Sequence, residues 1–107
     1  MEIRQYQIVL VNLDPSIGTE MKKTRPAVII SPDEMNRYLQ TIIIAPMTKT
    51  SKPYPTRIGI TQRKTRGWIV LDQVRTIDRR RILKTLGQLA AKDIEKTKSG
   101  RRESGVD

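Results

Sequence analysis

The hydrophobic residues of this chain occur in short runs, separated by polar segments that contain proline, glycine or charged residues. Runs of this length, rich in Ile and Val and bounded by turn residues, are typical of β-strands. Two runs, PAVII and TIIIAP, are continuously apolar, as expected of buried strands. The pattern predicts strands at 7–13, 26–30, 41–46, 56–60 and 68–71, an extended segment at 74–77 and a last strand at 83–89.

Helix signals are few and local. Ser31 can serve as a cap, Pro32 suits the first helical position and Glu34 follows the cap by three residues, so a short helix to about Tyr38 is predicted. A second, weak helix is predicted at 90–98.

Together these elements predict a mainly β fold, a small antiparallel barrel with a short helix after the second strand and a helix at the C-terminus. A chain of 107 residues is expected to form one domain. We assign that domain to residues 1–98 and expect a polar, disordered tail at 99–107.

The sequence contains no Cys and no His. Their absence excludes disulfides and thiolate zinc sites, and it removes the usual general base near neutral pH. The first ten residues do not resemble a leader, and no apolar run approaches the roughly 18 residues of a membrane span. We therefore expect a cytoplasmic protein that has no contact with a membrane.

The formal net charge is +10, which indicates an anionic partner. The excess lies on the body of the chain, because residues 92–107 hold five basic and four acidic side chains, whereas residues 57–84 hold nine basic and two acidic ones. A basic face of this kind is typical of nucleic-acid binding. A solubilising surface is the alternative explanation for a charge run taken alone.

RNA offers a reaction that needs neither histidine nor metal, since its 2′-hydroxyl is itself a nucleophile beside the phosphorus. An enzyme must then take the hydroxyl proton, stabilise charge on the phosphoryl oxygens and assist the leaving 5′-oxygen. Our hypothesis is that Glu20, Arg25 and Thr48 meet at one phosphodiester.

Each of these residue types suits one part of that reaction. The planar guanidinium of Arg25 matches phosphate oxygens, and the hydroxyl of Thr48 can donate to the same group. Glu20 is assigned the proton-taking role, although the neighbouring Lys22 and Lys23 favour its ionised form and so weaken it as a base. Taken singly, each residue is more often an ordinary surface or turn residue.

Short motifs then appear in a fixed order along the chain. They are LDP at 13–15, GTE at 18–20, RP at 25–26, NR at 36–37, PMT at 46–48 and DQVRTID at 72–78. In this order and spacing the chain resembles the MazF/PemK (Kid) family of type II toxin-antitoxin endoribonucleases. The resemblance covers roughly residues 8–89.

The resemblance implies a small SH3-like barrel of the CcdB/PemK/MazF type. It implies sequence-specific, metal-independent cleavage of single-stranded mRNA, which leaves a 2′,3′-cyclic phosphate and a 5′-hydroxyl and inhibits translation and growth. Arg25 and Thr48 match the catalytic pair of the family, and Glu20 matches its loop acid. Substrate contacts are expected from Gly18, Thr19, Lys49, Ser51, Lys52 and Gln73.

The resemblance also implies partners. They are an acidic cognate antitoxin that covers the RNA groove, a second copy of the chain in a homodimer, and operator DNA bound mainly through the antitoxin complex. No cofactor or metal is implied.

Two other functions of the same fold stay open at this point. One is a CcdB-like gyrase inhibitor, although that branch depends on a C-terminal Trp-Gly-Ile and this chain ends Gly-Val-Asp. The other is a nucleic-acid-binding module with weakened catalysis, for which a short C-terminal helix would be the reason.

Overall fold

The structure is a computed structural model that describes residues 2–13, 24–62 and 65–104. In that part of the chain no helix combines the length and the apolar character needed to cross a membrane. In chain order the elements are β1 (Gln7–Asn12), β2 (Thr24–Ile29), α1 (Asp33–Tyr38), β3 (Thr41–Thr48), β4 (Arg57–Gln62), β5 (Thr65–Val70), the 3-10 turn η1 (Leu71–Gln73), β6 (Arg75–Asp78), the 3-10 turn η2 (Arg79–Arg81), β7 (Ile82–Gln88) and α2 (Ala91–Ser104).

The strands form one antiparallel sheet in the order β4-β5-β3-β2-β1-β7, and β6 pairs separately with β3. Among the described strands the ladder does not close into a ring. The prediction of a mainly β, antiparallel fold with a short helix after the second strand and a C-terminal helix is confirmed.

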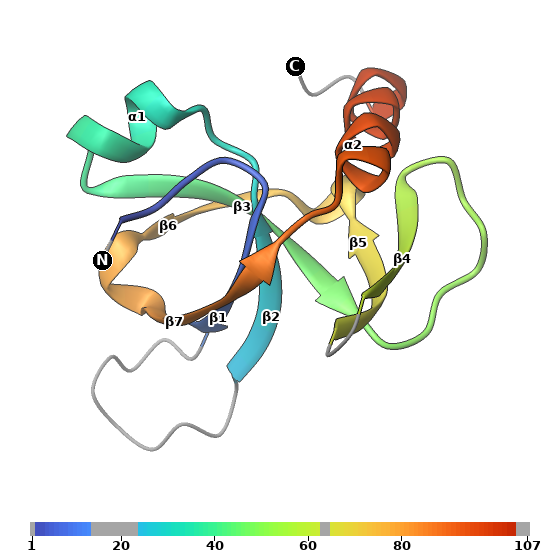
Figure 1. Ribbon diagram of the computed structural model, residues 1–107, viewed down its shortest axis with the longest axis horizontal. Coiled ribbons are helices and arrows are strands. Elements are labelled where there is room, and N and C mark those ends of the chain that lie inside the picture. The colour runs from blue at the N-terminus through green and yellow to red at the C-terminus, as the bar shows by residue number, and fades with distance from the viewer. Residues whose placement is uncertain (1, 14–23, 63–64, 105–107) are drawn as a thin grey trace.

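Strand β3 connects the two halves of this sheet. Its residues 41–44 pair with β6, residues 44–46 pair with β2, and its last two residues pair with β5. Figure 1 shows β3 crossing the molecule from α1 to the β4–β5 hairpin. The strand predicted at 41–46 therefore ends two residues too early, because Met47 and Thr48 belong to β3 and not to a loop.

Side chains on the two faces of the central strands enter two separate cores. In β2, Val28 packs into the first core, and its neighbours Ala27 and Ile29 pack into the second. A strand that is buried on both faces has no polar face, and this explains the continuously apolar runs in the sequence.

The first helix begins one residue later than predicted. Its N-cap is Pro32, and no side chain caps it. The hydroxyl of Ser31 is buried and serves a different purpose, since it donates to the side-chain oxygen of Asn36 and accepts from the backbone N–H of Ile43 at 3.1 Å. Asn36 donates in return to the carbonyl of Ser31 at 2.8 Å. The predicted cap is therefore a buried link between α1 and β3.

The second helix is longer than predicted. It continues to Ser104, so the boundary placed between residues 98 and 99 is wrong as a helix end, and only 105–107 of the expected tail lie outside the described residues. Figure 1 shows α2 above the β4–β5 hairpin. Its buried positions include Thr97 and Gly100, and a β-carbon on Gly100 would lie 2.6 Å from Leu71 and 3.0 Å from Ile58.

Ser31→Ala should destabilise the protein by about 1–3 kcal/mol, because the backbone N–H of Ile43 and the side-chain oxygen of Asn36 would each lose a partner in a buried position. Urea unfolding followed by circular dichroism measures the change. Ser99→Ala, at an exposed helical position, is the control and should change the free energy of unfolding by less than about 0.5 kcal/mol. Equal losses in the two variants would contradict the buried link.

Candidate active site

Arg25 and Thr48, which are far apart in the sequence, line the same groove. Its volume is about 490 Å³. Two further cations, Lys49 and Arg66, line it, and no carboxylate is among its described lining residues. The remaining described lining residues are Thr24, Pro26, Met47 and Leu86. The groove can therefore bind an anion through several positive side chains at once.

The strand register explains how two of these residues meet. The last paired positions of β2 and β3 are Ala27 and Pro46. Continuing that antiparallel register by two residues places Arg25 opposite Thr48. Although the ladder itself ends at Ala27 and Pro46, this register places both side chains on the same face, where both line the groove. A guanidinium and a hydroxyl can thus contact one phosphate.

Thr48 occupies the end of a strand and not a loop. It pairs with Trp68 of β5, while Met47 pairs with Ile69 in the first core. Buried neighbours on the opposite face therefore fix the backbone that carries Thr48. Its side chain is half-buried, which suits a donor held in place before an anion binds.

Gly67 permits this pairing. Its φ is +152°, and a β-carbon at this position would lie 2.5 Å from the carbonyl oxygen of Thr48. Real side chains do not approach a backbone oxygen so closely. Only glycine therefore allows β5 to come this near the end of β3.

The segment after Thr48 is tied to η1 by a set of polar contacts. Arg57 forms a two-pronged ion pair with Asp72, with Nε–Oδ1 at 2.8 Å and Nη2–Oδ2 at 3.1 Å, and it donates to Ser51 Oγ at 2.9 Å. The guanidinium also lies 5.6 Å from the centre of the Tyr54 ring. Hydrogen bonds from Arg57, reinforced by one from Thr56, hold the pKa of Asp72 at about 2.

The predicted substrate-contacting residues separate into three groups. Lys49 lines the groove. Ser51, Lys52 and Gln73 are not among its described lining residues; Ser51 instead bonds to Arg57, and the other two are exposed. Gly18 and Thr19 lie outside the described residues, as does the predicted catalytic residue Glu20.

Arg66 lines the groove but was not among the predicted site residues. In the sequence it lies in a charged segment between the strands predicted at 56–60 and 68–71. The segment is instead part of the β4–β5 hairpin, where Arg66 pairs with Thr61. Because residues 66 and 68 alternate with Gly67, Arg66 shares a face with Trp68. Only the position of the hairpin beside β3 brings Arg66 to the groove.

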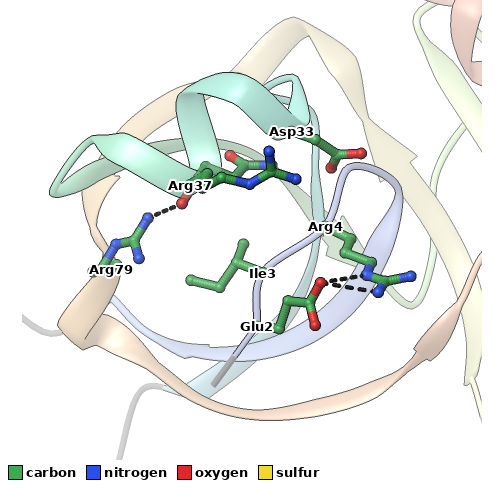
Figure 2. Close-up of a pocket in the computed structure, with 7 residues that line it drawn as sticks. Glu2, Ile3, Arg4, Asp33, Arg37 and Arg79 are labelled. Atoms are coloured by element: carbon green, nitrogen blue, oxygen red, sulfur yellow. Dashed lines mark hydrogen bonds and ion pairs between the residues drawn. The ribbon is translucent and has the colours of Figure 1, made fainter.

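A second hollow, of about 300 Å³, lies between the N-terminal segment, α1 and Arg79. Figure 2 shows both acidic and basic side chains around it. Arg4 pairs with Glu2 at 2.9 Å, and Arg79 donates to the carbonyl oxygen of Asn36. Asp33 adds a second carboxylate. Unlike the groove, this hollow has carboxylates that offset its positive charge.

Within the described part of the chain, no three acidic side chains gather where they could hold a metal ion. Fold and groove together define a small antiparallel β protein with a cationic groove at the junction of β2, β3 and β5.

Comparison with known proteins identifies the family. The sequence model of PemK-like, MazF-like toxins of type II toxin-antitoxin systems matches residues 4–103. The chain is 34% identical over 90 residues to the endoribonuclease MazF of Staphylococcus epidermidis, an alignment that covers 78% of this chain and 75% of that protein. This chain belongs to the PemK-like, MazF-like toxin family, as its sequence motifs suggested.

Solved structures agree on the fold. An endoribonuclease from a mycobacterial species, in complex with its cognate antitoxin, superposes with a TM-score of 0.83 at 16% identity over 95% of this chain and 93% of that chain. MazF from Deinococcus radiodurans has a TM-score of 0.80 at 23% identity over 99% of both chains.

Gly67→Ala should destabilise the protein by about 1–3 kcal/mol more than Gly87→Ala, because the new methyl group would collide with the carbonyl of Thr48. Gly87 is a matched control: it has the same φ of +152°, but a β-carbon there would meet no atom within 4 Å. Any strain from the backbone angle therefore cancels in the difference. Urea unfolding of both variants measures this difference in the free energy of unfolding. Equal losses of stability in the two variants would show that β5 and β3 leave room for a methyl group at position 67.

Stability should fall as the pH decreases from about 4 to 2, in part because Asp72 takes up a proton. Its pKa is lowered from 3.8 to about 2 in the folded state, so the ion pair stabilises the fold above pH 4, and this contribution disappears as the pH falls through 2. The effect should be below about 1 kcal/mol, because 39% of the Asp72 side chain is exposed and water screens the pair.

Asp72→Asn should flatten the dependence of the free energy of unfolding on pH over this interval. Glu34→Gln, at an exposed position in α1, removes one carboxylate without this ion pair and serves as the control. Parallel curves for wild type and Asp72→Asn would contradict the assignment.

Proposed function

We propose that this protein is the toxin of a type II toxin-antitoxin system and acts as a metal-independent, sequence-specific endoribonuclease on single-stranded RNA. The observation that carries the proposal is the meeting of Arg25 and Thr48 at one groove in a chain of the MazF family. The relative from Staphylococcus epidermidis, itself named an endoribonuclease, supports it.

The reaction is a transfer within the RNA. The 2′-oxygen attacks the adjacent phosphorus, the bond from phosphorus to the 5′-oxygen breaks, and the products carry a 2′,3′-cyclic phosphate and a 5′-hydroxyl. The 2′-hydroxyl loses a proton, and the departing 5′-oxygen gains one. Charge on the two non-bridging oxygens rises in the transition state, so donors that contact these oxygens lower the barrier.

Arg25 supplies that stabilisation, since its guanidinium can contact two phosphate oxygens at once. Thr48 donates a hydroxyl hydrogen bond from the end of a buried strand, where its position is fixed before the substrate arrives. Lys49 and Arg66 extend the positive lining, which draws the RNA backbone into the groove. Glu20 is assigned the proton-taking role because it is the nearest carboxylate in the sequence and matches the loop acid of the family.

An acidic antitoxin is the proposed regulator. A segment rich in Asp and Glu can occupy the same cationic groove and exclude RNA. The complexes of a mycobacterial endoribonuclease with its cognate antitoxin and of MazE with MazF from Deinococcus radiodurans support such a partner for this chain. We further propose a homodimer, a cytoplasmic location, and binding of operator DNA mainly through the antitoxin complex.

The CcdB-like gyrase inhibitor is not favoured. The family match and the relative that is named an endoribonuclease both point to RNA cleavage. A binding module without turnover is separated from the enzyme by the cleavage test below.

Purified protein should cut a long single-stranded RNA in the presence of EDTA, with cut sites that share a short sequence. Arg25→Ala should slow cutting by at least about 100-fold, because one donor to the transition state is lost. Sequencing locates the cuts, and direct phosphorylation of the product by polynucleotide kinase identifies the 5′-hydroxyl.

Arg37→Ala removes one positive charge from the exposed surface of α1, outside the groove, and should leave the cleavage rate unchanged. A requirement for Mg²⁺, or cutting by Arg25→Ala at the wild-type rate, would refute the mechanism. Binding of RNA without any cutting would support the module instead.

A further inference from the structure

A hollow of about 310 Å³ adjoins the groove. The two share Lys49 and Arg66 as lining residues, so they are neighbouring parts of one surface. The hollow is also lined by Trp68, the single tryptophan of the chain, together with Gly59, Ile60 and Gly67. An aromatic ring with two cations beside it is a combination suited to a nucleotide, because the ring can stack on the base and the cations can bind phosphate.

The strand register fixes where this ring lies. Trp68 pairs with Thr48 on one side and with Gly59 on the other. Side chains at directly opposed positions share a face of the sheet, with β-carbons about 5 Å apart. Trp68 therefore stands next to Thr48, on the face that carries the proposed site.

Gly59 gives the ring its position. A β-carbon on Gly59 would lie 3.3 Å from Cζ3 and 3.4 Å from Cε3 of Trp68, so the ring rests directly against a residue that has no side chain. On the opposite face of the same strands, Ile58 and Ile69 are in the first core. The half-buried Trp68 does not enter that core, and its uncovered surface lines the hollow.

We propose that the hollow is a nucleobase subsite, in which Trp68 stacks on the base of a nucleotide next to the cleaved phosphodiester. Lys49 and Arg66, on the boundary between hollow and groove, bind the phosphate that links this nucleotide to the reacting one. The inference rests on the proposed function and names the residue that holds the neighbouring base. Stacking accepts any base, so Trp68 contributes affinity and register more than base identity.

The test uses the fluorescence of Trp68, which no second tryptophan obscures. A 2′-O-methyl RNA heptamer of mixed sequence serves as the probe, since stacking accepts any base and a probe without a free 2′-hydroxyl cannot be cleaved. The matched probe is an abasic 2′-O-methyl oligomer of the same length, with the same phosphates and no bases. We expect the heptamer to quench Trp68 on saturation and the abasic oligomer, bound to saturation as judged by anisotropy, to leave the emission unchanged.

Four variants, one of them a control, separate stacking from charge. Trp68→Ala should weaken heptamer binding at least about fivefold with no change in its salt dependence, and Trp68→Phe, which keeps an aromatic face, should recover most of that loss. Lys49→Ala should instead lower the slope of log affinity against log salt by about 0.7. Tyr38→Ala removes an aromatic ring that is 77% exposed on α1, outside the hollow, and should bind the heptamer like wild type.

Equal quenching by the two oligomers, no quenching at saturation, or wild-type affinity in Trp68→Ala would each overturn the subsite. These outcomes are independent of turnover, because the probe is not cleaved. RNA cutting without quenching would leave the endoribonuclease in place and remove the subsite. Quenching without cutting of ordinary RNA would keep the base site and remove the proposed activity.

Discussion

The fold depends on one strand, β3, which pairs with β6 and β2 along its first part and with β5 at its end. A strand that serves both halves of the sheet must be buried on both faces, and its even-numbered and odd-numbered side chains accordingly enter different cores. Its final residue, Thr48, lies where the two halves meet. The place where the sheet changes partners is thus also the place where the groove forms.

Strand pairing at this junction positions the side chains that line the groove. Thr48, Trp68 and Gly59 follow one another across three paired strands, so strand pairing sets their spacing, and Arg25 of the neighbouring strand β2 lines the same groove. Glycine at position 67 is the condition for that spacing, since a larger residue would separate β5 from β3. Preorganised donors of this kind do not have to be ordered when the substrate binds.

Much of this arrangement could be predicted from the sequence, and the failures have physical reasons. Short apolar runs identify the strands, but the strand predicted at 41–46 stops before Thr48, whose side chain is polar although its backbone pairs with Trp68. The second helix predicted from the sequence is too short because its buried positions include Thr97 and Gly100 and do not form an apolar stripe. Arg66 was missed because its place at the groove follows from the hairpin packing beside β3, which no local pattern encodes.

Charged side chains inside and outside the groove differ in whether they have a partner of opposite charge. Several carboxylates outside the groove pair with a nearby cation: Glu2 with Arg4, Asp72 with Arg57, Asp78 with Arg80 and Glu95 with Lys98. Hydrogen bonds from Arg80 and Gln40 lower the pKa of Asp78, as those from Arg57 and Thr56 lower that of Asp72, so both carboxylates stay ionised and paired at more acidic pH than an ordinary Asp side chain. The described lining of the groove has cations and no carboxylate, and its positive potential therefore remains available to an incoming polyanion. RNA and an acidic protein segment both carry the negative charge that this potential would attract. The cations that attract the substrate would therefore also allow an acidic partner to inhibit the protein.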